Sequence, residues 1–262
     1  MSLLVCEGVT RRFGGLVAVD AVDLAVGEGE IVGLIGPNGS GKSTMVNLVT
    51  GVLPPSAGRI RFAGRDVTGM PSWRVARLGI ARTFQMLRLF KSMSVRENVA
   101  LALHPKLDGG LLGSALGLAR PAAADRDARA RADALLDLFG LAALADRPAT
   151  ALSIGQQRMV ELARGMIVEP RLFVLDEPAA GLSPPNVEKL IELIRAMRDR
   201  HGITILLVEH VMKVVHALCD RVVVLDYGVK IADDDPDAVA RDPRVVEAYI
   251  GGARKADDAG AG

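Results

Sequence analysis

A glycine-rich stretch ending in a lysine and two hydroxyl residues is the part of the sequence best suited to bind phosphate. It reads G-P-N-G-S-G-K-S-T and follows the apolar run 31–35. It fits G-x-x-x-x-G-K-[ST], which forms a phosphate-binding loop when a strand precedes it and a helix follows. A glycine-rich turn matching by chance is the competing interpretation, which the flanking residues disfavour. The residues of the loop are Gly36, Pro37, Asn38, Gly39, Ser40, Gly41, Lys42, Ser43 and Thr44.

The residue types of this loop suit a phosphate chain. Glycines can adopt positive φ, so Gly36, Gly39 and Gly41 let successive backbone N–H groups turn toward an anion. Lys42 supplies a positive charge for the β and γ phosphates, and the Ser43 hydroxyl can ligate Mg²⁺. A helix expected to follow, up to about residue 50, would direct its positive end at the same anions. The loop indicates a nucleotide-binding protein and no particular reaction.

Two adjacent carboxylates at the end of a later apolar run could complete a reaction centre. Residues 171–177 read R-L-F-V-L-D-E. Asp176, at the carboxyl end of the expected strand, could reach Mg²⁺ directly or through water. Glu177 is placed to orient or deprotonate an attacking water. An ordinary acidic turn would give the same pattern, but the phosphate loop upstream favours a hydrolytic site.

Composition limits the class of protein that could carry these groups. The chain has 262 residues, half of them hydrophobic, and a formal net charge of +1. We find no apolar run long enough to span a bilayer and no secretory signal, and we expect a soluble cytosolic protein. Cys6 and Cys219 are too few for a disulfide framework and are expected to be buried thiols. The small net charge gives no indication of a nucleic-acid partner.

The elements that must position the chemical groups follow from the apolar patterns. Up to residue 85 we expect short β segments within 3–35 with turns at 14–15 and 27–29, a strand at 58–62, a helix at 71–78 and a strand at 80–84. The next segment is mainly helical, with expected helices at 94–103, at 125–139 and from Ser153 to about residue 168. Residues 105–121 are rich in Gly and Leu and predict a loop or small insertion. We interpret 86–165 as a helical subdomain inserted into an α/β core.

The last part of the chain returns to alternating strands and helices. We expect strands at 171–175, 203–208 and 221–225, a helix at 184–200, a hairpin turn at 226–228 and a short helix at 244–250. Apolar runs separated by helices are typical of a parallel sheet covered on both faces. The α/β core would then comprise residues 1–85 and 166–252. The tail 253–262 has few apolar residues and is expected to be disordered.

Residues 152–157, which read L-S-I-G-Q-Q, open one of the expected helices. Because they follow the phosphate loop and precede the two carboxylates, the sequence resembles the ATP-binding subunits of ABC transporters. The signature of that family is usually written L-S-G-G-Q. Ser153, Gly155 and Gln156 match it, and Ile154 replaces the first glycine, a departure that the family tolerates. The resemblance covers about residues 3–250.

The resemblance implies a fold and a role for the signature. The fold would be a P-loop NTPase (ABC ATPase) core of class α/β with a mainly parallel sheet, an N-terminal antiparallel β subdomain and an inserted helical subdomain. In the family, the signature serine, its second glycine and the positive end of the helix contact the γ-phosphate held by the other protomer. Ser153, Gly155 and Gln156 would therefore act on the nucleotide of a partner chain.

Other positions match the family one at a time. Gln85 resembles the Q-loop glutamine, which contacts Mg²⁺ or the attacking water and links the core to the helical subdomain. His210 resembles the switch histidine that contacts the γ-phosphate, although an ordinary polar residue at a strand end would look the same. Phe13 resembles the aromatic that stacks on adenine, or belongs to the core. Many members have Asp where this chain has Ser183, which puts the coupling between the two sites in doubt.

One branch of the family is closer than the rest, namely the longer ATPase subunit of branched-chain amino acid importers. The stretches that resemble it are 11–16, 81–85 with 88–90, 177–182, 225–228 and 246–251. Importers of urea and short amides use closely similar ATPases, so the substrate stays open. A non-transport ABC ATPase is less favoured, because the chain has a single cassette and no heptads. A regulatory module without catalysis is disfavoured by the intact catalytic set, Lys42, Gln85, Asp176, Glu177 and His210.

The resemblance also implies partners. Two ATPase chains, identical or different, would sandwich two ATP with Mg²⁺ and drive two membrane permease subunits, with a periplasmic substrate-binding protein acting indirectly. The chain would then lie at the cytoplasmic face of the bacterial inner membrane. Residues 86–97 are where a coupling helix of a permease would dock in such a protein, on an apolar floor that includes Phe90 and with basic residues at its rim. The alternative is that these apolar residues belong to the core.

Overall fold

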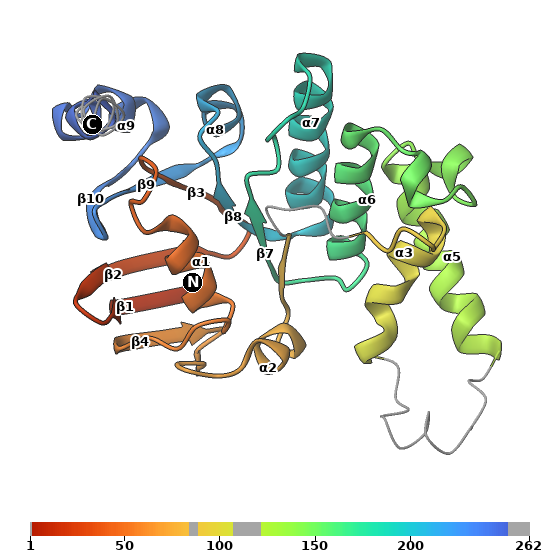
Figure 1. The fold of residues 1–262 in the computed structure, drawn as a ribbon, viewed down its shortest axis with the longest axis horizontal. Coiled ribbons are helices and arrows are strands. Elements are labelled where there is room, and N and C mark those ends of the chain that lie inside the picture. The colour runs from red at the N-terminus through yellow and green to blue at the C-terminus, as the bar shows by residue number, and fades with distance from the viewer. Residues whose placement is uncertain (1, 84–88, 107–121, 251–262) are drawn as a thin grey trace.

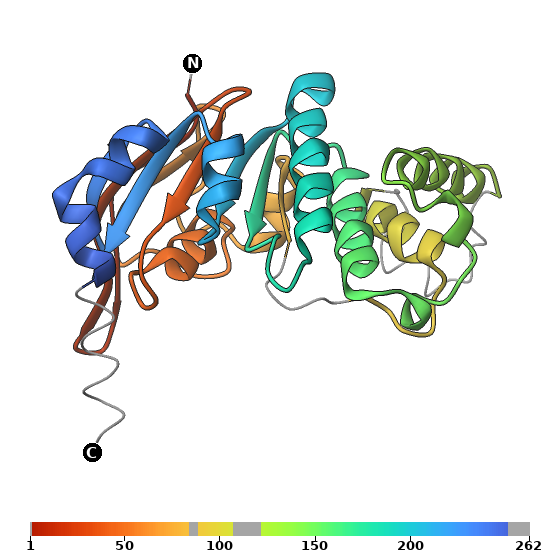
Figure 2. The same cartoon turned by 90° about the horizontal axis from the view of Figure 1, so that it is seen from above.

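The computed structural model describes residues 2–83, 89–106 and 122–250. Gln85, most of the expected 105–121 insertion and the tail 253–262 lie outside the described residues. Within them, the chain forms two sheets and two sets of helices (Figure 1). The sheets and the short helix α1 lie toward one end of the molecule, whereas α3, α5 and α6 lie toward the other (Figures 1 and 2).

The larger sheet is mainly parallel and carries the expected strands. Its order is β10-β9-β3-β8-β7-β6, in which only the β9–β10 pair is antiparallel. The strands are β3 (Ile31–Ile35), β6 (Ile80–Arg82), β7 (Leu172–Asp176), β8 (Thr204–Val208), β9 (Arg221–Asp226) and β10 (Val229–Asp234). Parallel strands place their carboxyl ends at one edge, which gathers the loops that follow β3, β7 and β8.

The smaller sheet is antiparallel, with the order β2-β1-β4-β5. Its strands are β1 (Ser2–Phe13), β2 (Leu16–Gly27), β4 (Ala57–Phe62) and β5 (Arg65–Asp66). The expectation of short β segments before residue 35 was wrong, because β1 and β2 are each 12 residues long. Their pairing contains several register shifts, including one between Cys6 and Val9. Such bulges interrupt the alternation of apolar and polar residues, so the pattern understated the length of each strand although the turns expected at 14–15 and 27–29 lie where the strands end.

The helices that were expected are present and differ from the prediction at their ends, whereas the short helices α8 and α9 were not predicted. They are α1 (Lys42–Val49), α2 (Ser72–Arg77), α3 (Val95–Ala100), α5 (Ala122–Leu138), α6 (Ile154–Met166), α7 (Pro184–His201), α8 (Met212–Leu218) and α9 (Pro236–Arg241), with residues 243–250 also helical. The helix expected at 94–103 is α only as far as Ala100 and continues as a 3-10 segment, Leu101–Lys106. Two further 3-10 segments are Ala142–Leu144 and Ala149–Ala151.

The larger sheet is buried on both faces, as expected for a parallel sheet. In β3, Ile31 and Ile35 join the core cluster that contains α6 and α7, while Val32 and Leu34 join the cluster shared with α1 and the antiparallel sheet. Helix α6 approaches β7 very closely, since a Cβ at Gly165 would lie 2.2 Å from the Phe173 ring. One core cluster therefore packs against each face of the parallel sheet.

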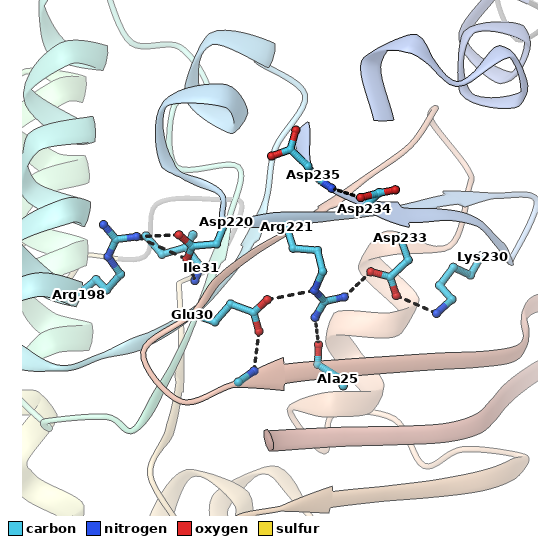
Figure 3. Close-up of polar contacts among 11 residues, drawn as sticks. Ala25, Glu30, Ile31, Arg198, Asp220, Arg221, Lys230, Asp233, Asp234 and Asp235 are labelled. Atoms are coloured by element: carbon cyan, nitrogen blue, oxygen red, sulfur yellow. Dashed lines mark hydrogen bonds and ion pairs between the residues drawn. The ribbon is translucent and has the colours of Figure 1, made fainter. Parts of the chain in front are cut away.

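Polar contacts fix the other end of the parallel strands (Figure 3). The Arg221 guanidinium, at the start of β9, donates to Glu30 at 3.0 Å and to the Ala25 carbonyl at 2.6 Å. Asp220 accepts the Ile31 amide at 2.8 Å and an Arg198 N–H at 3.1 Å. These bonds join β2, β3, β9 and α7 away from the carboxyl ends, which stay available for a site. Cys6 and Cys219 are both buried and free, as expected. Of the helices that are described, none has the length and apolar character to cross a bilayer.

Candidate active site

The phosphate loop joins β3 to α1 in the shape that its glycines were expected to allow. The φ angles of Gly36, Gly39 and Gly41 are 147°, 80° and 105°. Glycine is also required sterically at position 36, because a Cβ at Gly36 would lie 2.1 Å from the Leu225 carbonyl oxygen. A Cβ at Gly41 would lie 2.6 Å from the carbonyl oxygen of Ala18. The loop is therefore shaped by β9 and β2 as well as by its own sequence.

The β9–β10 turn supports the loop through one residue. Gly228 donates its N–H to the Ser40 carbonyl at 2.9 Å, and its own carbonyl accepts the Asp20 N–H at 2.8 Å. Gly228 has φ 82°, and a Cβ there would lie 2.8 Å from the Ala18 carbonyl oxygen. The expected hairpin turn is thus present, and it joins the antiparallel sheet to the phosphate loop.

The Lys42 side chain lies inside the loop. Its ammonium donates to the carbonyl oxygens of Gly36 at 2.7 Å and Pro37 at 2.8 Å. Burial lowers the pKa of this ammonium, while the negative charges of Glu177 and Asp176 act in the opposite direction. Those carboxylates are therefore close enough to Lys42 for their charges to act on its ammonium.

The two carboxylates occupy different environments at the end of β7. Asp176 is buried, and its carboxylate accepts a hydrogen bond from the Arg82 guanidinium at 2.8 Å. Glu177 has left the strand with φ 49°, a value rare for a residue with a side chain, and its N–H donates to the Val208 carbonyl at 2.9 Å. The chain thus turns sharply after Asp176, and Glu177 is only partly buried whereas Asp176 is buried.

A buried glutamate connects the Glu177 segment to His210. Glu209 is 1% exposed, and its carboxylate accepts the N–H of Ala179 at 2.8 Å and that of His210 at 3.0 Å. The side chain of His210 is exposed at the carboxyl end of β8. Sequence reasoning singled out His210 but missed Glu209, although a carboxylate ending an apolar strand beside a candidate histidine was a visible signal.

The signature residues begin α6 as a capped helix. The Ser153 hydroxyl accepts the Gln156 N–H at 3.3 Å, and the Gln156 side chain accepts the Ser153 N–H at 2.9 Å. A hydroxyl that accepts in this way can still donate its own hydrogen to another group. Gly155 faces α7 closely, since a Cβ there would lie 2.7 Å from the Asn186 amide nitrogen. In both views β8 and β7 separate α6 from α1 (Figures 1 and 2).

Phe13 and Phe90 are the exposed aromatic side chains among the predicted contacts. Phe13 is 41% exposed, with the Arg11 guanidinium 4.6 Å from its ring centroid, so it is not a core residue. Phe90 is 51% exposed, and its backbone is held by hydrogen bonds to the buried Asn98. The expected basic rim includes Arg96, which is instead paired with Asp133 and Asp146. The rim is therefore less positive than the sequence indicated.

Comparison with known proteins gives the family. Residues 19–180 match the family described as ABC transporter. The chain belongs to the ABC transporter family. Residues 229–255 also match the family described as Branched-chain amino acid ATP-binding cassette transporter.

Individual relatives of this ABC transporter chain cover nearly its whole length. It is 43% identical over 249 residues to the high-affinity branched-chain amino acid transport ATP-binding protein LivG of Salmonella typhimurium. The aligned region covers 95% of this chain and 98% of LivG. It is 42% identical to BraF of Pseudomonas aeruginosa, with the same coverage.

Solved structures agree with this assignment. The ADP conformation of MJ1267, an ATP-binding cassette of an ABC transporter, has a TM-score of 0.84 and 33% identity, covering 96% of this chain and 99% of MJ1267. The dimeric MJ0796 cassette bound to ADP and Pi has a TM-score of 0.76 and 26% identity, covering 89% and 98%. The family, the fold class and the ATPase assignment made from the motifs are thereby confirmed.

The donor atoms available to a metal suit Mg²⁺ bound together with a nucleotide. No group of three or more His, Cys, Asp or Glu side chains is arranged to hold a metal ion in the part of the chain that the structure describes. Three oxygen donors were predicted, of which Gln85 lies outside the described residues. The other two, the Ser43 hydroxyl and the Asp176 carboxylate, are hard ligands. Mg²⁺ usually takes one or two carboxylates and completes its shell with phosphate oxygens and water. The set therefore fits Mg²⁺.

Proposed function

We propose that the chain binds ATP with Mg²⁺ in the phosphate loop and hydrolyses it with Glu177 acting on the attacking water. The observation that supports this most is the placement of the Lys42 ammonium inside the phosphate loop, where it donates to the carbonyl oxygens of Gly36 at 2.7 Å and Pro37 at 2.8 Å and where the negative charges of Glu177 and Asp176 act to raise its pKa. In this proposal the loop amides and Lys42 hold the β and γ phosphates, and Ser43 and Asp176 hold the metal. The metal would neutralise charge that develops on the phosphates.

Two chains are needed for a complete site in this proposal. The separation of α6 from α1 within one chain leaves Ser153 and Gly155 to act on the nucleotide of a partner chain. The free donor of the Ser153 hydroxyl and the positive end of α6 suit the γ-phosphate. Gln85 and His210 would contact the metal or the phosphate in the same closed pair, and Phe13 would stack on adenine.

The chain is also proposed to serve as the motor of an importer for branched-chain amino acids. LivG and BraF, which are named for this transport, share 43% and 42% of their residues with it, and the match at 229–255 belongs to the same branch. Residues 1–85 and 166–252 would form the ATPase core and 86–165 the helical subdomain. The protein would then work at the cytoplasmic face of the membrane with two permease subunits and a periplasmic binding protein.

The segment after Gln85 is the proposed docking site for a permease. A cavity of about 310 Å³ is lined by Leu89, Lys91, Ala149, Thr150 and Gln157, so the two chain neighbours of the exposed Phe90 both border it. Leu89 is only partly buried against the core, so it gives the cavity an accessible apolar side chain beside the polar side chains of Lys91, Thr150 and Gln157. A short helix from a membrane subunit would bury such side chains against its own apolar face.

Transport in proteoliposomes tests this function. The chain would be reconstituted with the permease subunits, and uptake of radiolabelled leucine, isoleucine and valine would be compared with uptake of urea and acetamide. We expect ATP-dependent uptake of the branched-chain amino acids, and none when Glu177→Gln replaces the wild-type chain. Uptake of urea without leucine would assign the motor to an amide importer. ATP hydrolysis that no permease stimulates would instead favour a non-transport ATPase.

A further inference from the structure

The guanidinium of Arg82 joins the proposed metal ligand to the helix that follows the phosphate loop. Arg82 is the last residue of β6, the edge strand beside β7. One of its terminal nitrogens donates to Asp176 Oδ2 at 2.8 Å, and the other donates to Asn47 Oδ1 in α1 at 2.6 Å. The Arg82 and Asp176 side chains are only 14% and 4% exposed. The ion pair is therefore largely outside water, where screening is weak.

The end of β6 also fixes the backbone at Asp176. The Thr83 hydroxyl accepts the Asp176 N–H at 3.0 Å, and the Thr83 N–H donates to the Val174 carbonyl at 3.0 Å. Asp176 is therefore held twice, through its carboxylate by Arg82 at the end of β6 and through its amide by Thr83, the next residue along the chain. A planar guanidinium with two donors on one side chain can span Asp176 and Asn47 together, which a lysine ammonium cannot do with the same geometry.

We propose that Arg82 is a positioning residue for the Asp176 carboxylate, aiming it at the metal that accompanies the nucleotide. This inference rests on the proposed role of Asp176 as a Mg²⁺ ligand. Because Arg82 engages Oδ2, the plane of the carboxylate is set by the protein before a metal arrives. Partners of this kind behind a metal ligand usually contribute about 10- to 100-fold to metal affinity.

Arg82 also lines a cavity. It forms part of the wall of a cavity of about 450 Å³, which is lined mainly by α2, the end of α1 and β6, and includes Trp73, Ala102 and Val168. One side chain thus borders both this cavity and the carboxylate of Asp176. A molecule that filled the cavity would contact the residue that aims the metal ligand.

Binding of a fluorescent ADP analogue to the isolated full-length chain tests the proposal. Affinity is measured in EDTA and in Mg²⁺, and the ratio of the two is the gain due to the metal. For Arg82→Ala we expect this gain to fall about tenfold while the affinity in EDTA stays within about twofold of wild type. Arg82→Lys should recover part of the gain, because it keeps a charge beside Asp176 but loses the reach to Asn47. Arg74→Ala, which removes an exposed arginine of α2, is the matched control and should leave the gain unchanged.

Manganese binding followed by electron paramagnetic resonance gives a readout independent of nucleotide fluorescence. With ADP present, Arg82→Ala should bind Mn²⁺ about tenfold more weakly than wild type. If Arg82→Ala is too unstable to measure, the comparison is made between Arg82→Lys and wild type, where a smaller loss of the same kind is expected.

Three outcomes overturn the inference. They are an unchanged metal gain in Arg82→Ala, an equal loss of affinity in EDTA and in Mg²⁺, and the full loss of metal gain in the Arg74→Ala control. A wild-type chain that binds no ADP in either condition would contradict the proposed function itself, so the two failures are distinguishable.

Discussion

The Lys42 ammonium donates a hydrogen bond to the Gly36 carbonyl oxygen at 2.7 Å, which closes the phosphate loop on itself. The positive charge that should meet the β and γ phosphates is thus already placed at the centre of the loop. Removing this side chain removes both the charge and the bonds that fix the loop around it.

Lys42→Ala is expected to reduce ATP hydrolysis by the reconstituted complex by about 10³-fold or more. The lost charge stabilises the transferring phosphoryl group, and removing one such preorganised contact lowers kcat by at least about 10²- to 10³-fold. The measurement is phosphate release under saturating ATP and Mg²⁺. Lys213→Ala, which removes an exposed lysine of α8, is the control and should keep wild-type hydrolysis. Normal hydrolysis by Lys42→Ala would contradict the loop assignment.

Glu177→Gln should leave ATP binding intact and slow hydrolysis by on the order of 10² or more, because the amide cannot take a proton from water. ATP should then hold two chains together, which light scattering detects as a doubled mass. Glu192→Gln, an exposed position on α7, should do neither. Ordinary turnover by Glu177→Gln would mean that another group handles the water.

Ser153→Arg should block hydrolysis while the isolated monomer still binds ATP with nearly wild-type affinity. The arginine would obstruct the contact of α6 with a nucleotide held by the partner chain. Asp235→Arg is the matched control, because the Asp235 side chain caps α9 by accepting the N–H groups of Asp237 and Ala238, away from the signature and from the proposed docking segment. Both variants lose a helix cap that contributes about 1 kcal/mol, so both should have a slightly lower melting temperature. Only Ser153→Arg should lose hydrolysis. Loss of ATP binding by the monomer would place the signature at its own nucleotide.

Phe90→Asp should weaken co-purification with the permease subunits without lowering the melting temperature of the isolated chain. The ring is 51% exposed, so replacing it removes few core contacts, whereas a charge would oppose an apolar partner. Val246→Asp adds the same charge at a 42% exposed position and should assemble normally. Val246 belongs to the helical residues 243–250, which lie next to α9 at the end of the molecule away from α3 (Figure 1). A large fall in melting temperature for Phe90→Asp would identify the ring as part of the core.

The features that could be predicted from sequence are those encoded by neighbouring residues. The phosphate loop and the capped start of α6 at Ser153 each lie within a few consecutive positions. The strands of the parallel sheet were also predictable, because burial on both faces leaves unbroken apolar runs such as β8.

The features that could not be predicted depend on residues distant in the chain. The contact of Arg82 with Asp176 spans 94 positions, and that of Glu209 with Ala179 spans 30. No local pattern marks such pairs, because either partner would look like an ordinary polar residue at a strand end. Helix α8 was missed for another reason. It is only seven residues long and nearly as apolar as the strands on either side. Seven residues are too few for the helical periodicity of apolar positions to be recognised.

Strand β3 lies between β8 and β9, although the ribosome makes it long before either of them. The loop that follows it is shaped by the carbonyl of Leu225 and by the amide of Gly228. A nascent chain that ends before these residues lacks both neighbours of β3 and the backbone that shapes the loop. ATP therefore cannot act as a template for early folding, and the pocket matures only after residue 228 has been made. Prematurely terminated products would accordingly have no means of sequestering nucleotide from the finished protein.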